Sequence, residues 1–220
     1  VRRSLVASSD GRIFAGTRGE HPSSRAGGKL FCYTPMDDYS GLYGYRVGKI
    51  EVVTTPVEGD GIAALAIDND RKRIYGISTP KGLLFVYDIS SGEVEVKGAV
   101  DELGVFSDVL VVGKDGCAYG AKRWGSLFKY DPEREEIIPL NVEIPSIRGR
   151  KRYNKVDSLV LDEYSGRIYG GGSADGVLFY FDPQDEKMVS LGKPVAQPRI
   201  RALTVGRDGI VYGIGGEVGG

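Results

Sequence analysis

The residue types that most directly perform acid–base chemistry or bind metals are rare in this chain. It has one histidine, His21, which directly follows Glu20. An acid next to an imidazole can serve as a general base or a metal ligand near neutral pH. A lone histidine in a loop is also commonly a surface residue, and the sequence leaves both interpretations open.

Four charged residues occupy equivalent positions in the first strand of a repeated strand pattern. They are Arg3, Asp108, Asp157 and Arg201, with Ala63 at the fifth equivalent position. Two arginines and two aspartates at one level predict either a ring of ion pairs or a polar binding site. Asp108 and Asp157 join the glutamate–histidine pair as candidate catalytic residues, and Arg3 and Arg201 are candidate ligand-binding residues.

Two further segments interleave basic and aromatic side chains. Arginine offers forked donors to oxyanions, and aromatic rings offer stacking surfaces for sugars or bases. The alternative is a solvated basic surface, balanced by acids in the opposite turns. The candidate ligand-binding residues of these two segments are Lys122, Arg123, Trp124, Arg148, Arg150, Arg152 and Tyr153.

Several classes of function lack their usual motifs here. The chain has no P-loop, no C-x-x-C pair, no G-x-S-x-G and no histidine-rich metal cluster, so we expect no cofactor and no metal. The aspartates of Asp10-Gly11, Asp115-Gly116 and Asp208-Gly209 are explained by turn chemistry. A formal net charge of -1 over 220 residues gives no argument for a nucleic-acid or membrane partner. The chain opens on Val1 rather than methionine, and both a cytoplasmic and a secreted location stay open.

The elements that must position these residues are short β-strands. The segment 156–192 predicts four of them, at Ser158–Leu161, Arg167–Gly170, Val177–Phe181 and Lys187–Leu191. Short β-branched and aromatic runs bounded by Gly, Asp and Pro are typical of an antiparallel meander. One such sheet cannot bury both faces alone, so it needs copies of itself to pack against.

Copies of this segment recur along the chain. Tyr-Gly pairs begin at positions 75, 119, 169 and 212, which are 44, 50 and 43 residues apart. This spacing is the four-strands-per-blade period of a β-propeller. A glycine inside a strand normally costs stability, so we interpret the glycine of each pair as a site of close approach by another backbone.

The repeat D-G-x-x-Y-G followed by G-x-L-F-x-Y-D-P resembles the blades of the kelch, NHL and streptogramin-lyase-like propeller families over nearly the whole chain. This resemblance implies an all-β fold of four-stranded antiparallel blades. It does not imply one activity, because these propellers include lyases, hydrolases and binding platforms.

The blade assignment predicts one β-propeller domain over residues 1–220. Its blades are expected at about 3–52, 61–98, 107–140 and 156–192, with a half blade at 200–220. About four and a half blades indicate a segment of a longer chain, a ring completed by a partner, or open ends. Open ends would expose apolar blade faces and favour self-association.

The favoured hypothesis is a binding platform rather than an enzyme. It would use the loop-rich face around the central channel for an anionic ligand, a carbohydrate or a protein partner. One alternative is a propeller-type lyase or hydrolase with an acid–base or metal site at the channel mouth. Another is an assembly subunit that pairs through open blade faces.

Overall fold

The computed structural model describes residues 4–18, 27–36 and 48–216. This part of the chain is built from β-strands, with two short 3-10 helices. It divides into two compact units, residues 1–99 and 100–220, and each is described by itself.

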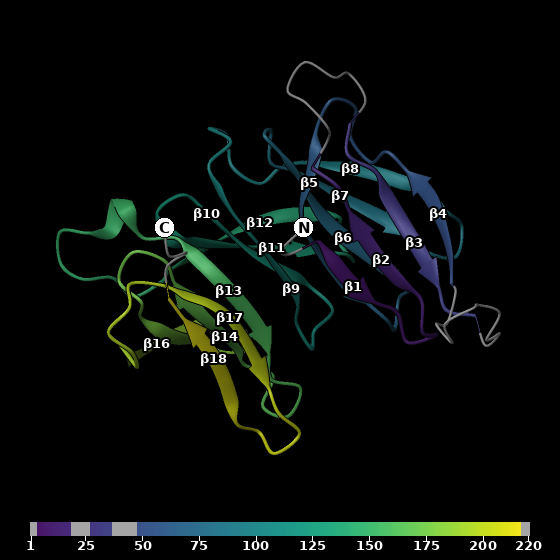
Figure 1. Cartoon of the computed structure of the whole chain (residues 1–220). Helices are drawn as coiled ribbons and strands as arrows, with labels where there is room; N and C mark the ends of the chain where they lie inside the picture. Colours follow the sequence, from purple (N-terminus) through teal and green to yellow (C-terminus); the bar gives the residue numbers. More distant parts are fainter. Residues whose placement is uncertain (1–3, 19–26, 37–47, 217–220) are drawn as a thin grey trace. The chain divides into compact units, whose positions relative to one another are not determined.

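Unit 1 contains two four-stranded antiparallel sheets, each in chain order. The first sheet is formed by β1 (Leu5–Ala7), β2 (Ile13–Gly16), β3 (Leu30–Thr34) and β4 (Lys49–Thr54). The second is formed by β5 (Gly61–Asp68), β6 (Arg73–Thr79), β7 (Leu83–Asp88) and β8 (Val94–Ala99). Figure 1 shows both as meanders of neighbouring strands.

Unit 2 contains two more four-stranded sheets and one of two strands. The first comprises β9 (Phe106–Val112), β10 (Ala118–Lys122), β11 (Ser126–Asp131) and β12 (Glu136–Glu143). The second comprises β13 (Val156–Leu161), β14 (Ile168–Gly172), β15 (Leu178–Asp182) and β16 (Lys187–Gly192). The third pairs β17 (Ile200–Val205) with β18 (Val211–Gly215).

Four four-stranded blades and a two-stranded one confirm the predicted repeat. The strands of the segment 156–192 begin and end within two residues of the predicted bounds. The largest difference is β12, which continues to Glu143 rather than ending near Leu140. A register shift between Ser126 and Phe128 on β11 lets Glu143 pair opposite Ser126, and this extends the strand.

In the three Tyr-Gly pairs whose sheets have a third strand, the glycine lies under a phenylalanine ring of that strand. Gly120 pairs directly with Phe128, and a Cβ on Gly120 would lie 2.5 Å from the Phe128 Cζ. Gly76 and Gly170 stand in the same relation to the phenylalanines of β7 and β15, at 2.1 and 2.3 Å. The sequence interpretation, close approach of another backbone, is therefore wrong. The approaching group is a cross-strand side chain, which fills the space that the glycine leaves.

In each unit the two four-stranded blades pack face to face, and the two contacting faces carry different residues. In unit 2 the face with Tyr119 contacts the face with Phe179 and Phe181. The Tyr119 and Phe181 ring centroids lie 5.8 Å apart and the rings are tilted. In unit 1 the equivalent pair is Phe14 and Tyr87, with centroids 6.1 Å apart. The repeat thus builds the same inter-blade core twice.

The Asp-Gly turns have the geometry that their sequence predicts. In each of the three turns the aspartate accepts a hydrogen bond of 3.1 Å from the backbone N–H two residues later. The glycines have φ of +88°, +78° and +76°, a conformation that other residues adopt at a cost. Asp115 also accepts a 2.6 Å hydrogen bond from the hydroxyl of the buried Tyr119. Turn chemistry therefore accounts for these aspartates.

Both cysteines are buried and free, as small apolar residues would be. Cys32 belongs to the core of unit 1 and Cys117 to the core of unit 2. Burial raises the pKa of the Cys117 thiol to about 12. This thiol therefore stays protonated and unreactive at neutral pH.

We predict that Gly120→Ala destabilises the chain, although alanine in a strand ordinarily stabilises relative to glycine. The added methyl must displace the Phe128 ring, because no space lies between them. The free energy of unfolding, measured by urea denaturation, should fall by about 1–3 kcal/mol. In a double-mutant cycle with Phe128→Leu the two losses should be less than additive. Strict additivity would contradict the proposed contact.

We also predict that acid destabilises the fold through its turn aspartates. The pKa of the Asp88 carboxyl is lowered chiefly by a hydrogen bond from the Ser91 N–H. The Glu133 N–H and the Ser165 hydroxyl lower the pKa values of Asp131 and Asp162 in the same way. A carboxyl whose pKa is lower in the folded than in the unfolded chain stabilises the folded chain at pH values above its unfolded pKa of about 3.9. This stabilisation is lost as the pH falls through the folded pKa. The urea midpoint should therefore drop between about pH 4 and pH 2, and the drop should be smaller in Asp88→Asn. An identical pH profile in that variant would contradict the assignment.

Candidate functional site

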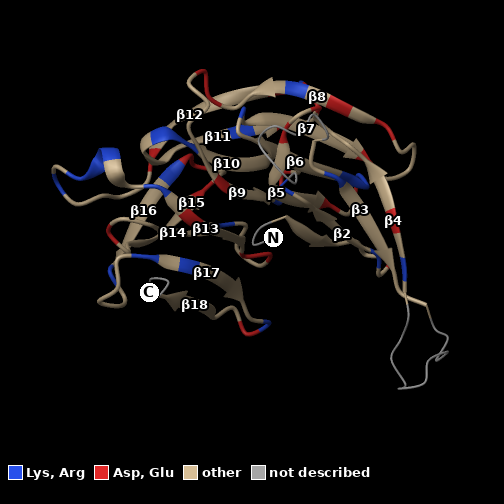
Figure 2. Ribbon diagram, turned by 45° about the horizontal axis from the view of Figure 1, so that its top comes forward, with Lys and Arg blue, Asp and Glu red and all other residues tan. Residues whose placement is uncertain are grey.

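The basic and aromatic segments of the sequence analysis meet in unit 2. We define the loop cluster as residues 122–125, 144–155 and 173–177, which follow β10, β12 and β14. The first two segments contain the 3-10 helices η1 (Arg123–Gly125) and η2 (Lys151–Tyr153), which contact each other. Lys and Arg colour much of the loop before β13 blue in Figure 2.

Two buried aspartates anchor the loop cluster. The Asp101 side chain is 1% exposed, and its Oδ2 lies 3.3 Å from the Arg123 Nε. The Asp175 side chain is fully buried, and its Oδ1 lies 3.2 Å from the Arg150 Nε. The other Asp175 oxygen accepts a 2.8 Å hydrogen bond from the Ile147 N–H. A buried carboxylate requires a partner of opposite charge, so these arginines serve to hold the loops.

Trp124, the middle residue of η1, has an unusual backbone conformation. It is the one tryptophan of the sequence, and its φ of 58° and ψ of 22° place it in the left-handed region. For a bulky residue this conformation costs about 1–3 kcal/mol and is typical of functional sites. The ring is 43% exposed. The Arg123 and Arg152 guanidinium carbons lie 5.3 and 6.0 Å from its centroid.

Four other cations of the loop cluster differ from Arg123 and Arg150 in their partners. Lys122, Arg148, Arg152 and Lys155 form no ion pair with a carboxylate of the described residues. The Arg152 guanidinium carbon lies 6.0 Å from the Trp124 centroid, the outer limit of a cation–π contact. Tyr153, next to it, is 74% exposed. The loop cluster therefore presents positive charge beside exposed aromatic surface.

The predicted ring of charges lies only partly within the described residues, because Arg3 falls outside them. Asp157 forms a two-bond ion pair with Arg199, at 2.5 and 2.7 Å. The Arg201 Nε instead donates to the Gly216 carbonyl at 2.9 Å. Asp108 is half-buried and has a partner, and Ala63 is buried in unit 1. Asp157 therefore has an ion-pair partner outside the predicted ring, and the ring itself stays a prediction.

Three predicted site residues lie outside the described part of the chain, namely Glu20, His21 and Arg3. Among the described residues, no three His, Cys, Asp or Glu side chains gather in a group that could hold a metal ion.

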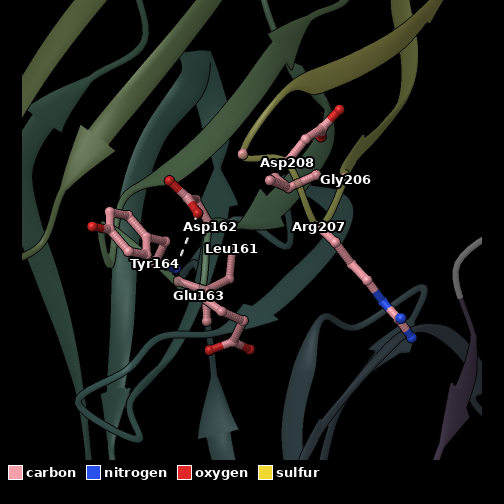
Figure 3. Close-up of a pocket in the computed structure, with 9 residues that line it drawn as sticks. Leu161, Asp162, Glu163, Tyr164, Gly206, Arg207 and Asp208 are labelled. Atoms are coloured by element: carbon pink, nitrogen blue, oxygen red, sulfur yellow. Dashed lines mark hydrogen bonds between the residues drawn. The ribbon is translucent and has the colours of Figure 1, made fainter.

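A cavity of about 470 Å³ lies elsewhere in unit 2, between the turns that follow β13 and β17. In Figure 3 the carboxylate of Asp162 faces Tyr164, while the Arg207 side chain extends away from both. Asp162 accepts hydrogen bonds from the Tyr164 N–H and the Ser165 hydroxyl, at 3.0 and 2.5 Å. Asp208 bonds to the Tyr212 hydroxyl at 3.2 Å. The aspartates of this cavity thus stabilise their own turns and neighbouring side chains.

The described residues contain no helix that is long and apolar enough to cross a membrane.

The fold, but not the family, is identified by comparison with known proteins. No protein-family model matches the chain, and no curated protein matches it in sequence. Virginiamycin B lyase from Staphylococcus aureus matches in structure with a TM-score of 0.69 and 11% identity, over 96% of this chain and 62% of that one. A catalytically inactive form of that lyase with quinupristin matches with a TM-score of 0.64 and 10% identity, over 92% and 59%. A chain of the mitotic checkpoint complex matches with a TM-score of 0.60 and 14% identity, over 97% and 59%.

These similarities confirm the predicted β-propeller fold and its all-β class. The chain spans about three fifths of the length of these solved chains. Identities of 10–14% show the architecture alone, and the solved structures differ in function. The function must therefore be argued from the loop cluster itself.

We predict that Asp175→Ala loosens the loop cluster. The substitution removes the acceptor of the Ile147 N–H and leaves Arg150 without its buried partner. Trypsin cuts after lysine and arginine, so cleavage within residues 148–155 of the native protein should become at least severalfold faster. Asp182→Ala, which alters a turn at the other end of β15, is the matched control and should leave this cleavage rate unchanged. Equal acceleration by both variants would contradict the anchoring role.

Proposed function

We propose that the chain is a binding platform whose loop cluster in unit 2 holds an anionic ligand. The observation that carries this proposal is Trp124, kept in a left-handed conformation and exposed while two guanidinium groups lie against its ring. A folded chain gains nothing in stability from that strain, so an external function is the better explanation. Trp124, Arg152 and Tyr153 would be the central binding residues.

The division of labour among the arginines supports an anion. Arg123 and Arg150 neutralise buried aspartates, whereas Arg152 has no carboxylate partner among the described residues. A cation–π contact with Trp124, at 6.0 Å from the ring centroid, favours a position of Arg152 beside the exposed ring before any ligand arrives. Lys122, Arg148 and Lys155 would add charge around it.

Binding is better supported than catalysis at this face. A lyase or hydrolase requires a carboxylate or imidazole that can accept a proton. Asp157 already accepts two hydrogen bonds from Arg199, so its carboxylate is engaged in an ion pair. One solved neighbour is a lyase and another is part of a protein assembly, so the shared fold itself does not choose between these functions.

We predict that an anionic polymer changes the fluorescence of Trp124, which reports on the loop cluster because the sequence has no other tryptophan. Heparin and inorganic polyphosphate should each produce a saturable change, and neutral dextran should produce none. Raising sodium chloride to about 0.5 M should weaken the response, because salt screens exposed charges. Arg152→Gln should weaken binding about tenfold, the value of one charge-assisted hydrogen bond.

The matched control is Arg134→Gln, which removes an exposed arginine from the turn between β11 and β12. It should leave the affinity within about twofold of the parent chain. Equal losses of affinity in the two variants would show that binding depends only on the net charge of the chain. This result would contradict a specific binding site in the loop cluster. A dextran response equal to that of both polyanions would also contradict it.

A further inference from the structure

Ile147 is an aliphatic side chain that the loop cluster presents to solvent. It is 49% exposed, although its backbone is fixed on both sides. Its N–H donates to Asp175, and its carbonyl accepts a 2.9 Å hydrogen bond from the Arg150 N–H. Gly149, the third residue of this four-residue turn, has the φ of +82° that glycine adopts readily. The exposed position of Ile147 therefore belongs to an ordered turn.

The segment around this turn carries charge of one sign. Residues 146–153 are all exposed and have the sequence SIRGRKRY, with four cations and no acid. The ion pairs of Lys151 with Glu143 and of Arg150 with Asp175 neutralise two of these cations. The other two have no carboxylate partner among the described residues. In Figure 2 the loop that carries them extends away from the sheets of unit 2.

Two exposed aromatic side chains adjoin the same segment. Trp124 lies near it, since the Arg152 guanidinium carbon is 6.0 Å from the ring centroid, and Tyr153 is its last residue. Both rings combine an apolar body with a polar group. Tryptophan and tyrosine are enriched at the level of the lipid headgroups in membranes for this reason. The loop cluster thus combines cations, interfacial aromatic residues and an exposed aliphatic group.

A dissolved polyanion would use only part of this surface. Cations and aromatic faces can bind such a ligand, but an ionic or hydrogen-bonding partner offers nothing to the Ile147 side chain. Aliphatic surface gains free energy only where it leaves water for an apolar environment. A bilayer with anionic headgroups supplies negative charge at its surface and acyl chains directly beneath. Charge complementarity and the exposed Ile147 together favour a bilayer over a polymer.

We propose that the loop cluster is a docking surface for bilayers that contain anionic phospholipid. Trp124, Ile147 and Tyr153 would enter the boundary between headgroups and acyl chains. Arg148 and Arg152 would bind the lipid phosphates. This inference rests on the proposed function, because it names the anionic ligand of the same loop cluster. It goes beyond that function in giving the exposed Ile147 side chain a role in binding.

The test mixes the 220-residue chain with vesicles and measures the bound fraction by flotation. Vesicles of phosphatidylcholine and phosphatidylserine in equal parts should bind the chain, and vesicles of phosphatidylcholine alone should not. Each cation near an anionic surface strengthens binding about fivefold, so Arg148→Gln should weaken it by about that factor. Brominated acyl chains should quench the fluorescence of Trp124, which is the one tryptophan of the sequence. Bromine quenches only at short range, so this readout reports entry of the ring into the bilayer.

A substitution of Ile147 distinguishes a bilayer from a dissolved polyanion. Ile147→Ser should weaken vesicle binding about tenfold, because the side chain no longer contributes aliphatic surface. It should leave the heparin affinity unchanged, which would also show that the variant is folded. The matched control is Ile210→Ser, since Ile210 is 54% exposed in the turn between β17 and β18. That turn adjoins the end of β13 remote from the loop cluster, so the control should change neither affinity.

Three results would overturn the inference. They are heparin binding without vesicle binding, equal flotation of Ile147→Ser and the parent chain, and flotation on brominated vesicles without quenching of Trp124. In each case the proposed function stands if the heparin affinity still depends on Arg152. Absence of both heparin and vesicle binding would contradict the proposed function and this inference together.

Discussion

The structure depends on a phenylalanine ring that occupies the space above a glycine of the neighbouring strand. Gly76, Gly120 and Gly170 each lie directly opposite such a ring, and the three rings are fully buried. Any side chain on the glycine would collide with the ring. The pairing therefore sets the register between the second and third strands. A shift of one residue would bring the tyrosine that precedes the glycine opposite the phenylalanine, where its side chain would leave no space for the ring. The register in turn decides which aromatic residues face the next blade.

The register of the strands also decides where the segments of the loop cluster begin. Because β10 and β14 end at equivalent levels of their sheets, the segments that follow them open on one face of unit 2, together with the connection between the blades. Loops on a fixed scaffold are free to carry binding residues. The scaffold alone does not hold them, however. Asp101 and Asp175 are buried beneath the loops and bind their arginines and backbone N–H groups.

Charge in the loop cluster consequently has two uses. A carboxylate removed from water must be paired with a group of opposite charge. The buried aspartates Asp101 and Asp175 are therefore each paired with an arginine, and these arginines are not free to bind a ligand. Arg123 and Arg150 of the loop cluster serve in this way, and so does Arg199 outside it. Arg152 has no carboxylate partner among the described residues and lies near the Trp124 ring. This difference, rather than the abundance of basic residues, is the reason for proposing Arg152 as a binding group.

The sequence by itself determined the β-propeller class, the number of strands and most of their bounds. These features depend on strand periodicity and turn chemistry, which are properties of residues close together in the chain. It also determined where basic and aromatic residues concentrate. Only the tertiary structure decided the partners. Nothing in the local pattern shows that Phe128 lies over Gly120, that Asp157 pairs with Arg199 instead of Arg201, or that Asp175 reaches the loop before β13. Such contacts join residues 8 to 42 positions apart, and their geometry arises only when the strands pair and the sheets pack together.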